Sequence, residues 1–152
     1  MSDCIKLRIS KMLYEYTNNK KYIQHRLEYL RNLHNVSPSD FQRDSVQGGA
    51  MDSAIERTID SILDDEILNK LYLTTIPIDD AIKEMSHDDS TLFFARFCSK
   101  LPWADVASCL HVAEITARSK RKKKLLNFVY AYVESYAKEY TNKTGKSVII
   151  IP

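Results

Sequence analysis

Apolar residues recur at steps of four and three over residues 5–34, and this spacing predicts one long helix. Polar residues fill the positions between them, so the helix carries one apolar stripe suited to pairing with another helix. Thr17, Asn18 and Asn19 are poor helix formers and mark the weak point of this prediction. The stripe consists of Ile9, Leu13, Tyr16, Ile23, Leu27, Leu30 and His34, and Lys20 occupies the slot between Tyr16 and Ile23.

A second helical pattern follows a stretch without periodicity. Residues 35–51 contain the breakers Ser-Pro and Gly-Gly, which predict a connecting loop. Asp52 or Ser53 can cap the next helix. We expect that helix to end at 72–75, because Pro77 disfavours helical geometry in the residue before it. The two helices are expected to form an antiparallel hairpin. The apolar face of the second helix should comprise Ile55, Ile59, Ile62 or Leu63, and Ile67.

Sharper signals appear in the second half of the chain. A short helix is expected at 78–85, and Asp88-Asp89-Ser90 can cap another at about 90–100. Pro102 suits the first turn of a helix at about 103–110, where its missing N–H does no harm. The spacing of Trp103, Val106, Ala107 and Leu110 gives that helix a buried face.

One long helix is expected after the short turn at His111-Val112. Glu114 is favourable near its N-terminus, and the apolar pattern resumes at Leu125 and continues to about residue 141. The apolar tail 147–152 could be a strand, a docked tail or an augmenting strand for a partner. The chain is therefore predicted to be all-α, with a helical hairpin at 1–77, a helix-turn-helix domain with a long last helix at 78–143, and a tail at 144–152.

Composition and charge narrow the function. The net charge is only +2, but residues 113–152 carry 9 basic and 3 acidic side chains, whereas residues 50–90 carry 3 and 11. Positive charge gathered on one part of the chain is typical of a protein that binds a polyanion. The acidic middle of the chain should then face away from that polyanion.

Several other classes of protein are disfavoured. The three cysteines lack C-x-x-C spacing, and we expect Cys98 and Cys109 to be small core residues. The histidines lack metal-ligand spacing, three glycines are too few for a phosphate loop, and the carboxylates at 64–66 and 79–80 are best explained as solvated charge. We expect no enzyme, no cofactor and no metal. No apolar run reaches the ~18 residues of a membrane span, and a cytoplasmic protein that does not bind a membrane is expected.

A helix, a tight turn and a second helix between about Leu92 and Lys124 predict a helix-turn-helix. In this module the second helix enters the major groove of DNA. Ala107 is small enough to let the two helices approach closely. Apolar anchors are needed before and after the turn, and the sequence supplies Val106, Leu110, Val112 and Ala117.

The polar face of the second helix supplies the candidate DNA contacts. We expect the residues of its first two turns to reach base edges and the basic run after them to neutralise phosphates, which makes binding steeply salt-dependent. The candidate DNA-binding residues are Glu114, Thr116, Arg118, Ser119, Lys120, Arg121, Lys122, Lys123 and Lys124.

Residues 97–119 read Phe-Cys-Ser-Lys-Leu-Pro-Trp-Ala-Asp-Val-Ala-Ser-Cys-Leu-His-Val-Ala-Glu-Ile-Thr-Ala-Arg-Ser, which resembles region four of bacterial sigma factors. The resemblance is greater to the phage and prophage late-gene regulators of the ArpU and RinA kind. Their sigma-like module follows a helical hairpin and a short I-x-x-A-I-x-x-L helix, to which Ile-Asp-Asp-Ala-Ile-Lys-Glu-Met at 78–85 is similar. The resemblance covers about 78–126 in sequence and is only architectural over 1–77.

Three positions depart from the family pattern. His111 stands in the turn where the family usually has Gly, and Lys120 and Lys124 stand where it usually buries Leu and Ala. Two alternatives follow: the recognition helix is shifted in register by one residue, or it leaves the core early and continues as a basic rod.

The resemblance implies a sequence-specific double-stranded DNA-binding regulator that activates phage late genes in the cytoplasm of a bacterial host. Promoter DNA is the expected partner, with host RNA polymerase as a further partner of the kind sigma region four has. The alternative is a phage terminase small subunit that recognises DNA for packaging, in which the N-terminal stripe would serve a homo-oligomer.

Overall fold

The computed structural model describes residues 1–34 and 50–145, and within these ranges the chain folds into six continuous helices and no strand. The expected all-α fold is confirmed. The helices are α1 (Asp3–Leu33), α2 (Ala50–Asp64), α3 (Glu66–Glu84), α4 (His87–Leu92) continued by the π-helical turn η2 (Phe93–Cys98), α5 (Trp103–Leu110), and α6 (Glu114–Thr116) continued by the π-helical turn η3 (Ala117–Arg121) and by α7 (Lys122–Thr144).

Contacts divide the chain into two compact units. The hairpin unit comprises residues 18–72, and the large unit comprises residues 1–17 and 73–152. These units differ from the predicted ranges 1–77 and 78–143, because the first turns of α1 pack with the C-terminal helices. The predicted loop at 35–51 lies outside the described residues up to residue 49, and so does the tail at 147–152.

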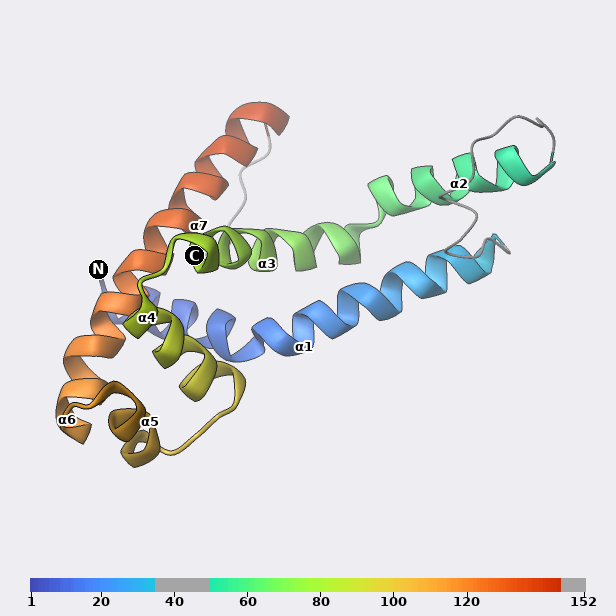
Figure 1. Ribbon diagram of the computed structural model, residues 1–152. Helices are drawn as coiled ribbons and strands as arrows, with labels where there is room; N and C mark the ends of the chain where they lie inside the picture. The colour runs from blue at the N-terminus through green and yellow to red at the C-terminus, as the bar shows by residue number, and fades with distance from the viewer. Residues whose placement is uncertain (35–49, 146–152) are drawn as a thin grey trace. The chain divides into compact units, whose positions relative to one another are not determined.

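In the hairpin unit α1 runs antiparallel to α2 and the start of α3 (Figure 1). His34 contacts Ser61 at 3.0 Å, and Arg26 binds Asp65 with its Nη2 at 2.7 Å from Oδ1 and its Nε at 3.1 Å from Oδ2. Later residues of α1 thus meet earlier residues of its partner, which confirms the hairpin. The core of this unit consists of Ile23, Leu30 and Leu68, with Leu27, Ile62, Leu71 and Tyr72 packed against them.

The sequence predicted that the second helix ends before Pro77, but in the structure the break falls at Asp65. Asp65 accepts a hydrogen bond from the backbone N–H of Leu68 at 2.9 Å, so it caps α3, which then runs through Pro77. The cap satisfies one of the four free N–H groups at a helix start. Proline removes one hydrogen bond from the interior of a helix, and here burial of Pro77 and Ile78 accompanies that loss.

This break also corrects the predicted apolar face of the second helix. Ile59, Leu63 and Ile67 are exposed, whereas Thr58 and Leu68 are buried. The Thr58 hydroxyl donates to the carbonyl of Ala54 at 2.8 Å, so its burial leaves no donor unsatisfied. The apolar pattern was read as one helix, but the chain starts a new helix at Glu66, and the face that meets α1 changes there.

The core of the large unit joins α1 to the helices of the C-terminal half. Ile9 and Leu13 of α1 pack with Phe93 and Phe97 of η2, and all four side chains are fully buried. The Tyr16 hydroxyl donates to the carboxylate of Asp79 on α3. The stripe predicted on α1 is therefore largely buried within this chain, in one core or the other, and the same residues do not offer an open face for a second copy.

Helix α4 begins at His87, three residues before the predicted start at about residue 90, so its cap is not in Asp88-Asp89-Ser90. Ser86 is its N-cap, and its hydroxyl accepts a hydrogen bond from the backbone N–H of Asp89 at 3.2 Å. Asp89 is buried in the first turn of the helix. Pro102 is the N-cap of α5, one position before its predicted place. No helix of the described residues has the length and apolar character needed to cross a membrane.

The Arg26–Asp65 pair predicts a pH-dependent stability. Hydrogen bonds from Arg26 hold the pKa of Asp65 below its usual value. We expect Asp65→Ala to lower the free energy of unfolding by at least about 1 kcal/mol at neutral pH, from loss of the cap. Because the folded-state pKa is depressed, this contribution is complete above the unfolded-chain pKa of about 4 and disappears as the pH falls through the folded-state value.

Urea unfolding of the wild type and of Asp65→Ala between pH 7 and pH 3 measures the difference in their free energies of unfolding. Asp64→Ala is the matched control, because Asp64 is exposed at the C-terminal end of α2, where a negative charge is unfavourable. An equal loss of stability in the two variants at every pH would contradict the assignment of Asp65 as cap and ion-pair partner.

Candidate nucleic-acid interface

Helices α5 and α6 are joined by the three residues 111–113, which is a helix-turn-helix arrangement (Figure 1). Val106, Ala107 and Leu110 of α5 and Ala117 at the start of η3 are buried, and Val112 packs against the same core. The predicted anchors therefore hold the two helices together. Burial of these side chains fixes the angle at which the second helix leaves the body of the unit.

The turn closes with a left-handed residue. His111 has φ 56° and ψ 41°, its N–H donates to the carbonyl of Ser108 at 3.2 Å, and the N–H of Val112 donates to the carbonyl of Ala107 at 3.1 Å. These two bonds define a Schellman motif, whose left-handed position is usually glycine. His111 thus adopts the backbone conformation that a glycine would adopt more easily.

The recognition helix, defined here as the continuous helix Glu114–Thr144, contains one residue more than a regular helix would between its anchors. The N–H of Lys122 donates to the carbonyl of Ala117, five residues earlier, which is the hydrogen bond of a π-helix. Such a turn inserts one residue into an α-helix, so every side chain after it is rotated by about 100° relative to an uninterrupted helix.

This extra residue keeps the apolar stripe on one face. Ala117, Leu125, Val129 and Val133 are all buried, at spacings that are multiples of four. Over sixteen residues a regular helix would turn the last position about 160° away from the first, and one inserted residue removes about 100° of this drift. The sequence left two alternatives, a one-residue shift in the register of the helix or a helix that leaves the core early. The structure has the one-residue shift, and the helix stays packed on the core.

Arg96 ties the helix-turn-helix to α1. Its Nε donates to the Tyr14 hydroxyl at 3.0 Å and its Nη1 to the carbonyl of Leu101 at 2.8 Å. Its guanidinium carbon lies 4.7 Å from the ring centroid of Trp103, a cation–π contact. The buried Trp103 is thus the core anchor that the sequence predicted, and one of its faces meets a cation.

Two members of the basic run turn toward the protein. Arg121 lies 3.5 Å from Asp88 of α4, and the Nζ of Lys122 lies 5.9 Å from the ring centroid of Trp103. Partial burial lowers the pKa of Lys122, and the positive charge of Arg96 lowers it further. The sequence had assigned both cations to phosphates, but a run of charges cannot reveal which members meet a neighbouring helix.

The remaining predicted residues form an open face, except for Thr116, which is half-buried. Arg118 pairs with Glu114 at 3.1 Å, and the Ser119 hydroxyl donates to the carbonyl of Ile115 at 2.6 Å. The exposed members of the predicted set are Glu114, Arg118, Ser119, Lys120, Lys123 and Lys124. Polar side chains in the first two turns of the helix are thus exposed, together with three of the five cations that follow them.

Ile115 is a candidate that the sequence analysis missed. It is 77% exposed, the highest value among the large apolar residues described as exposed, and it stands one turn before Ser119. An exposed apolar side chain on a recognition helix can contact the methyl group of thymine. The sequence could have identified Ile115, because it lies outside the buried stripe, one residue after Glu114 and two before Ala117.

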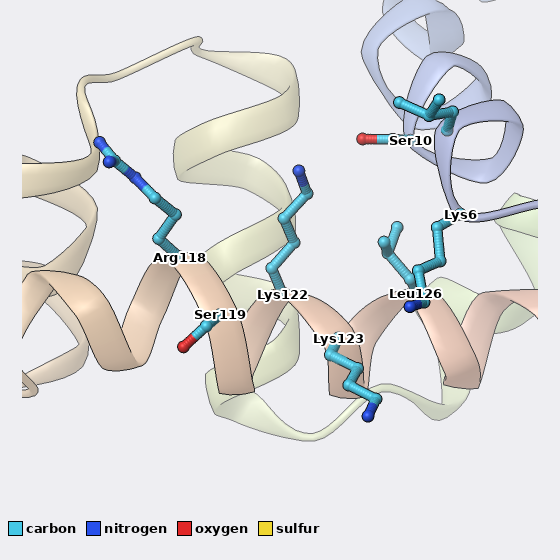
Figure 2. Close-up of a pocket in the computed structure, with 8 residues that line it drawn as sticks. Lys6, Ser10, Arg118, Ser119, Lys122, Lys123 and Leu126 are labelled. Carbon is cyan, nitrogen blue, oxygen red and sulfur yellow. The ribbon is translucent and has the colours of Figure 1, made fainter. Parts of the chain in front are cut away.

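A cavity of about 260 Å³ lies between the recognition helix and the start of α1, within the large unit (Figure 2). Arg118, Ser119, Lys122 and Lys123 line it from the recognition helix, and α1 contributes residues that the sequence analysis did not connect with the site. The residues from α1 are Lys6, Leu7 and Ser10, and Leu126 completes the lining.

The part of the chain that the structure describes contains no group of three or more His, Cys, Asp or Glu side chains that could hold a metal ion, and Cys4, Cys98 and Cys109 are free thiols. Cys98 is half-buried, but Cys109 is exposed on α5, which corrects its prediction as a core residue. Comparison with known protein families, curated proteins and solved structures finds no match to this chain.

The Schellman turn predicts that His111→Gly stabilises the protein. A non-glycine residue in the left-handed region costs about 1 kcal/mol, and glycine removes that cost. Thermal or urea unfolding should therefore give a free energy of unfolding higher by about 1 kcal/mol. In the control variant Ser108→Gly, the glycine lies inside α5 and should destabilise by roughly 0.5 kcal/mol. Equal destabilisation by both glycines would refute the left-handed geometry.

The π-turn predicts where the recognition helix tolerates a deletion. Deleting Lys120 from η3 should restore a regular helix and keep Leu125 and Val129 in the core, so cooperative thermal unfolding should persist. Deleting Asn127, the control, should rotate Val129 and Val133 out of the core by about 100°. Exposure of these two side chains should cost about 3–5 kcal/mol. Similar losses of stability in both deletion variants would contradict the register described above.

Proposed function

We propose that this protein is a sequence-specific double-stranded DNA-binding transcriptional regulator that reads DNA through the helix beginning at Glu114. The observation that carries the proposal is the open face of that helix. An apolar group and hydrogen-bonding groups, Ile115, Arg118 and Ser119, stand in its first two turns. The exposed cations Lys120, Lys123 and Lys124 follow in the next turns.

This order of side chains matches the two tasks of a DNA reader. Arg can bind guanine through two hydrogen bonds, and Ile can pack on a thymine methyl group. The lysines supply sequence-independent affinity through phosphate neutralisation. The Glu114–Arg118 pair is exposed and therefore weak, so Arg118 can exchange this partner for a base at small cost.

The resemblance to late-gene regulators extends the proposal to a biological role. On this view the protein activates phage late genes for packaging and structural proteins in the cytoplasm of a bacterial host. Host RNA polymerase would be its second partner. This role is supported by residues 78–126 of the sequence, together with the helical hairpin that precedes them.

Genome-wide capture of DNA bound to the tagged protein in its host tests the role. One dominant site upstream of a promoter supports a transcriptional regulator. Enrichment at a packaging start inside a gene, together with a ring-sized particle in solution, would assign the protein to DNA packaging instead. Absence of any enriched site would overturn the DNA-binding proposal.

Two sets of substitutions separate base contacts from phosphate contacts in the purified protein. Arg118→Ala should cost about 1–3 kcal/mol on the preferred site and relax the preference for one base pair. Neutralising Lys123 and Lys124 to Gln should weaken binding to every duplex alike and lower the salt slope by about 2.

The matched control for the double neutralisation is Lys138→Gln with Lys143→Gln. These lysines lie further along α7, exposed and paired with Glu134 and Glu139 at 3.0 and 2.6 Å. This variant should keep the wild-type affinity and salt slope. Identical losses in the two double variants would mean that binding depends on net charge alone, which would refute the assigned face.

A further inference from the structure

The cavity between the recognition helix and α1 has the composition of an anion site. Four cationic side chains and two hydroxyl groups line it, and carboxylates are absent from its lining. Its volume of about 260 Å³ is below the usual range for a drug-sized ligand, which is about 300–1,000 Å³. A small, strongly charged group suits such a cavity better than an extended apolar molecule.

Ser10 supplies a hydrogen-bonding group inside the cavity. The residue is only 8% exposed, and Figure 2 shows its hydroxyl directed into the same gap as the ammonium group of Lys122. Within the described part of the chain, its hydroxyl donates no hydrogen bond. Buried hydroxyl groups are normally hydrogen-bonded, and one open to a cavity can donate to a ligand there.

Lys122 supplies a positive charge that the protein does not neutralise. No carboxylate of the described residues lies within ion-pair distance of it, and the positive charge of Arg96 lies near enough to repel it. Burial lowers the pKa of Lys122 because it removes water from the charged ammonium group, and repulsion by Arg96 lowers it further. Partly buried charges are normally paired, so an anion beside Lys122 would supply the missing partner.

The rim of the cavity adds cations whose present partners are weak. Lys6 pairs at 3.0 Å with Asp3, whose side chain is 94% exposed, and Arg118 pairs with the half-exposed Glu114. Exposed pairs of this kind contribute little and exchange readily. Lys123 is exposed at the rim. An entering anion thus meets several cations that can turn toward it.

We propose that this cavity is a phosphate-binding site, with Ser10 and Lys122 inside it and Lys6 and Lys123 at its rim. Several ammonium donors and a hydroxyl match the multiple acceptor oxygens of a phosphate group. The inference rests in part on the proposed function, because a backbone phosphate of DNA is one source of this group. A free phosphorylated small molecule offers the same chemistry. In either case the first turns of α1 belong to the binding surface.

The first measurement uses inorganic phosphate and the full chain. Thermal unfolding in phosphate is compared with unfolding in chloride at equal ionic strength, and titration calorimetry gives the phosphate affinity. Phosphate should raise the midpoint of unfolding. Ser10→Ala should weaken phosphate binding about tenfold, the usual effect of losing a hydrogen bond to a charged group. Lys122→Met, which removes the charge but keeps an unbranched side chain of similar length, should abolish it.

The second measurement is the affinity of the same variants for duplex DNA. A DNA phosphate as the source predicts that Ser10→Ala weakens duplex binding as well. A free phosphorylated ligand predicts loss of phosphate binding with duplex affinity unchanged. Because the phosphate measurement contains no DNA, a wild-type protein that binds phosphate but no duplex would refute the proposed function and leave this site standing.

Matched controls make the outcome decisive. Ser135→Ala removes an exposed hydroxyl from α7, and Lys11→Gln removes an exposed charge from α1 outside the cavity. Both should behave like the wild type, whereas Lys6→Gln should weaken phosphate binding several-fold. The proposal is overturned when Ser10→Ala equals Ser135→Ala, and Lys6→Gln equals Lys11→Gln, in both measurements.

Discussion

One geometric constraint governs the C-terminal helix: Ala117 and Leu125 must reach the same core although eight residues separate them. A regular helix would point them about 80° apart, and the π-turn between them brings them into line. Every side chain after the turn takes its direction from this adjustment. Leu125, Val129 and Val133 enter the core because of it, and the lysines just before Leu125, Lys122 to Lys124, line the cavity or face solvent.

Arg96 joins the parts that this helix must hold together. It bonds Tyr14 of α1 and the carbonyl of Leu101, and it stacks on Trp103. A planar guanidinium can do this because it donates in several directions and stacks with its face. Its charge also makes the surroundings of Lys122 more positive. The same residue thus organises the core under the helix-turn-helix and contributes to the electrostatics of the adjacent cavity.

Local signals predicted the helix-turn-helix well and predicted distant partners poorly. The expected helix at 103–110 has the observed bounds Trp103–Leu110, because periodicity, the preceding proline and the turn residue all act within a few positions. Arg26, which binds the capping carboxylate of Asp65, lies 39 residues away in the sequence. The inward position of Lys122 and the role of Ser10 depend equally on which helices meet. The spacing of residues along the sequence does not predict contacts between such distant residues.

The position of Trp103 gives the large unit a built-in spectroscopic reporter. It is the only tryptophan of the chain, it is buried, and its ring centroid lies 4.7 Å from the Arg96 guanidinium carbon and 5.9 Å from the Lys122 Nζ. Indole emission responds to nearby charge and to solvent. Fluorescence excited selectively at tryptophan therefore arises from this one place, beside the cavity and under the recognition helix, and follows events there without any label.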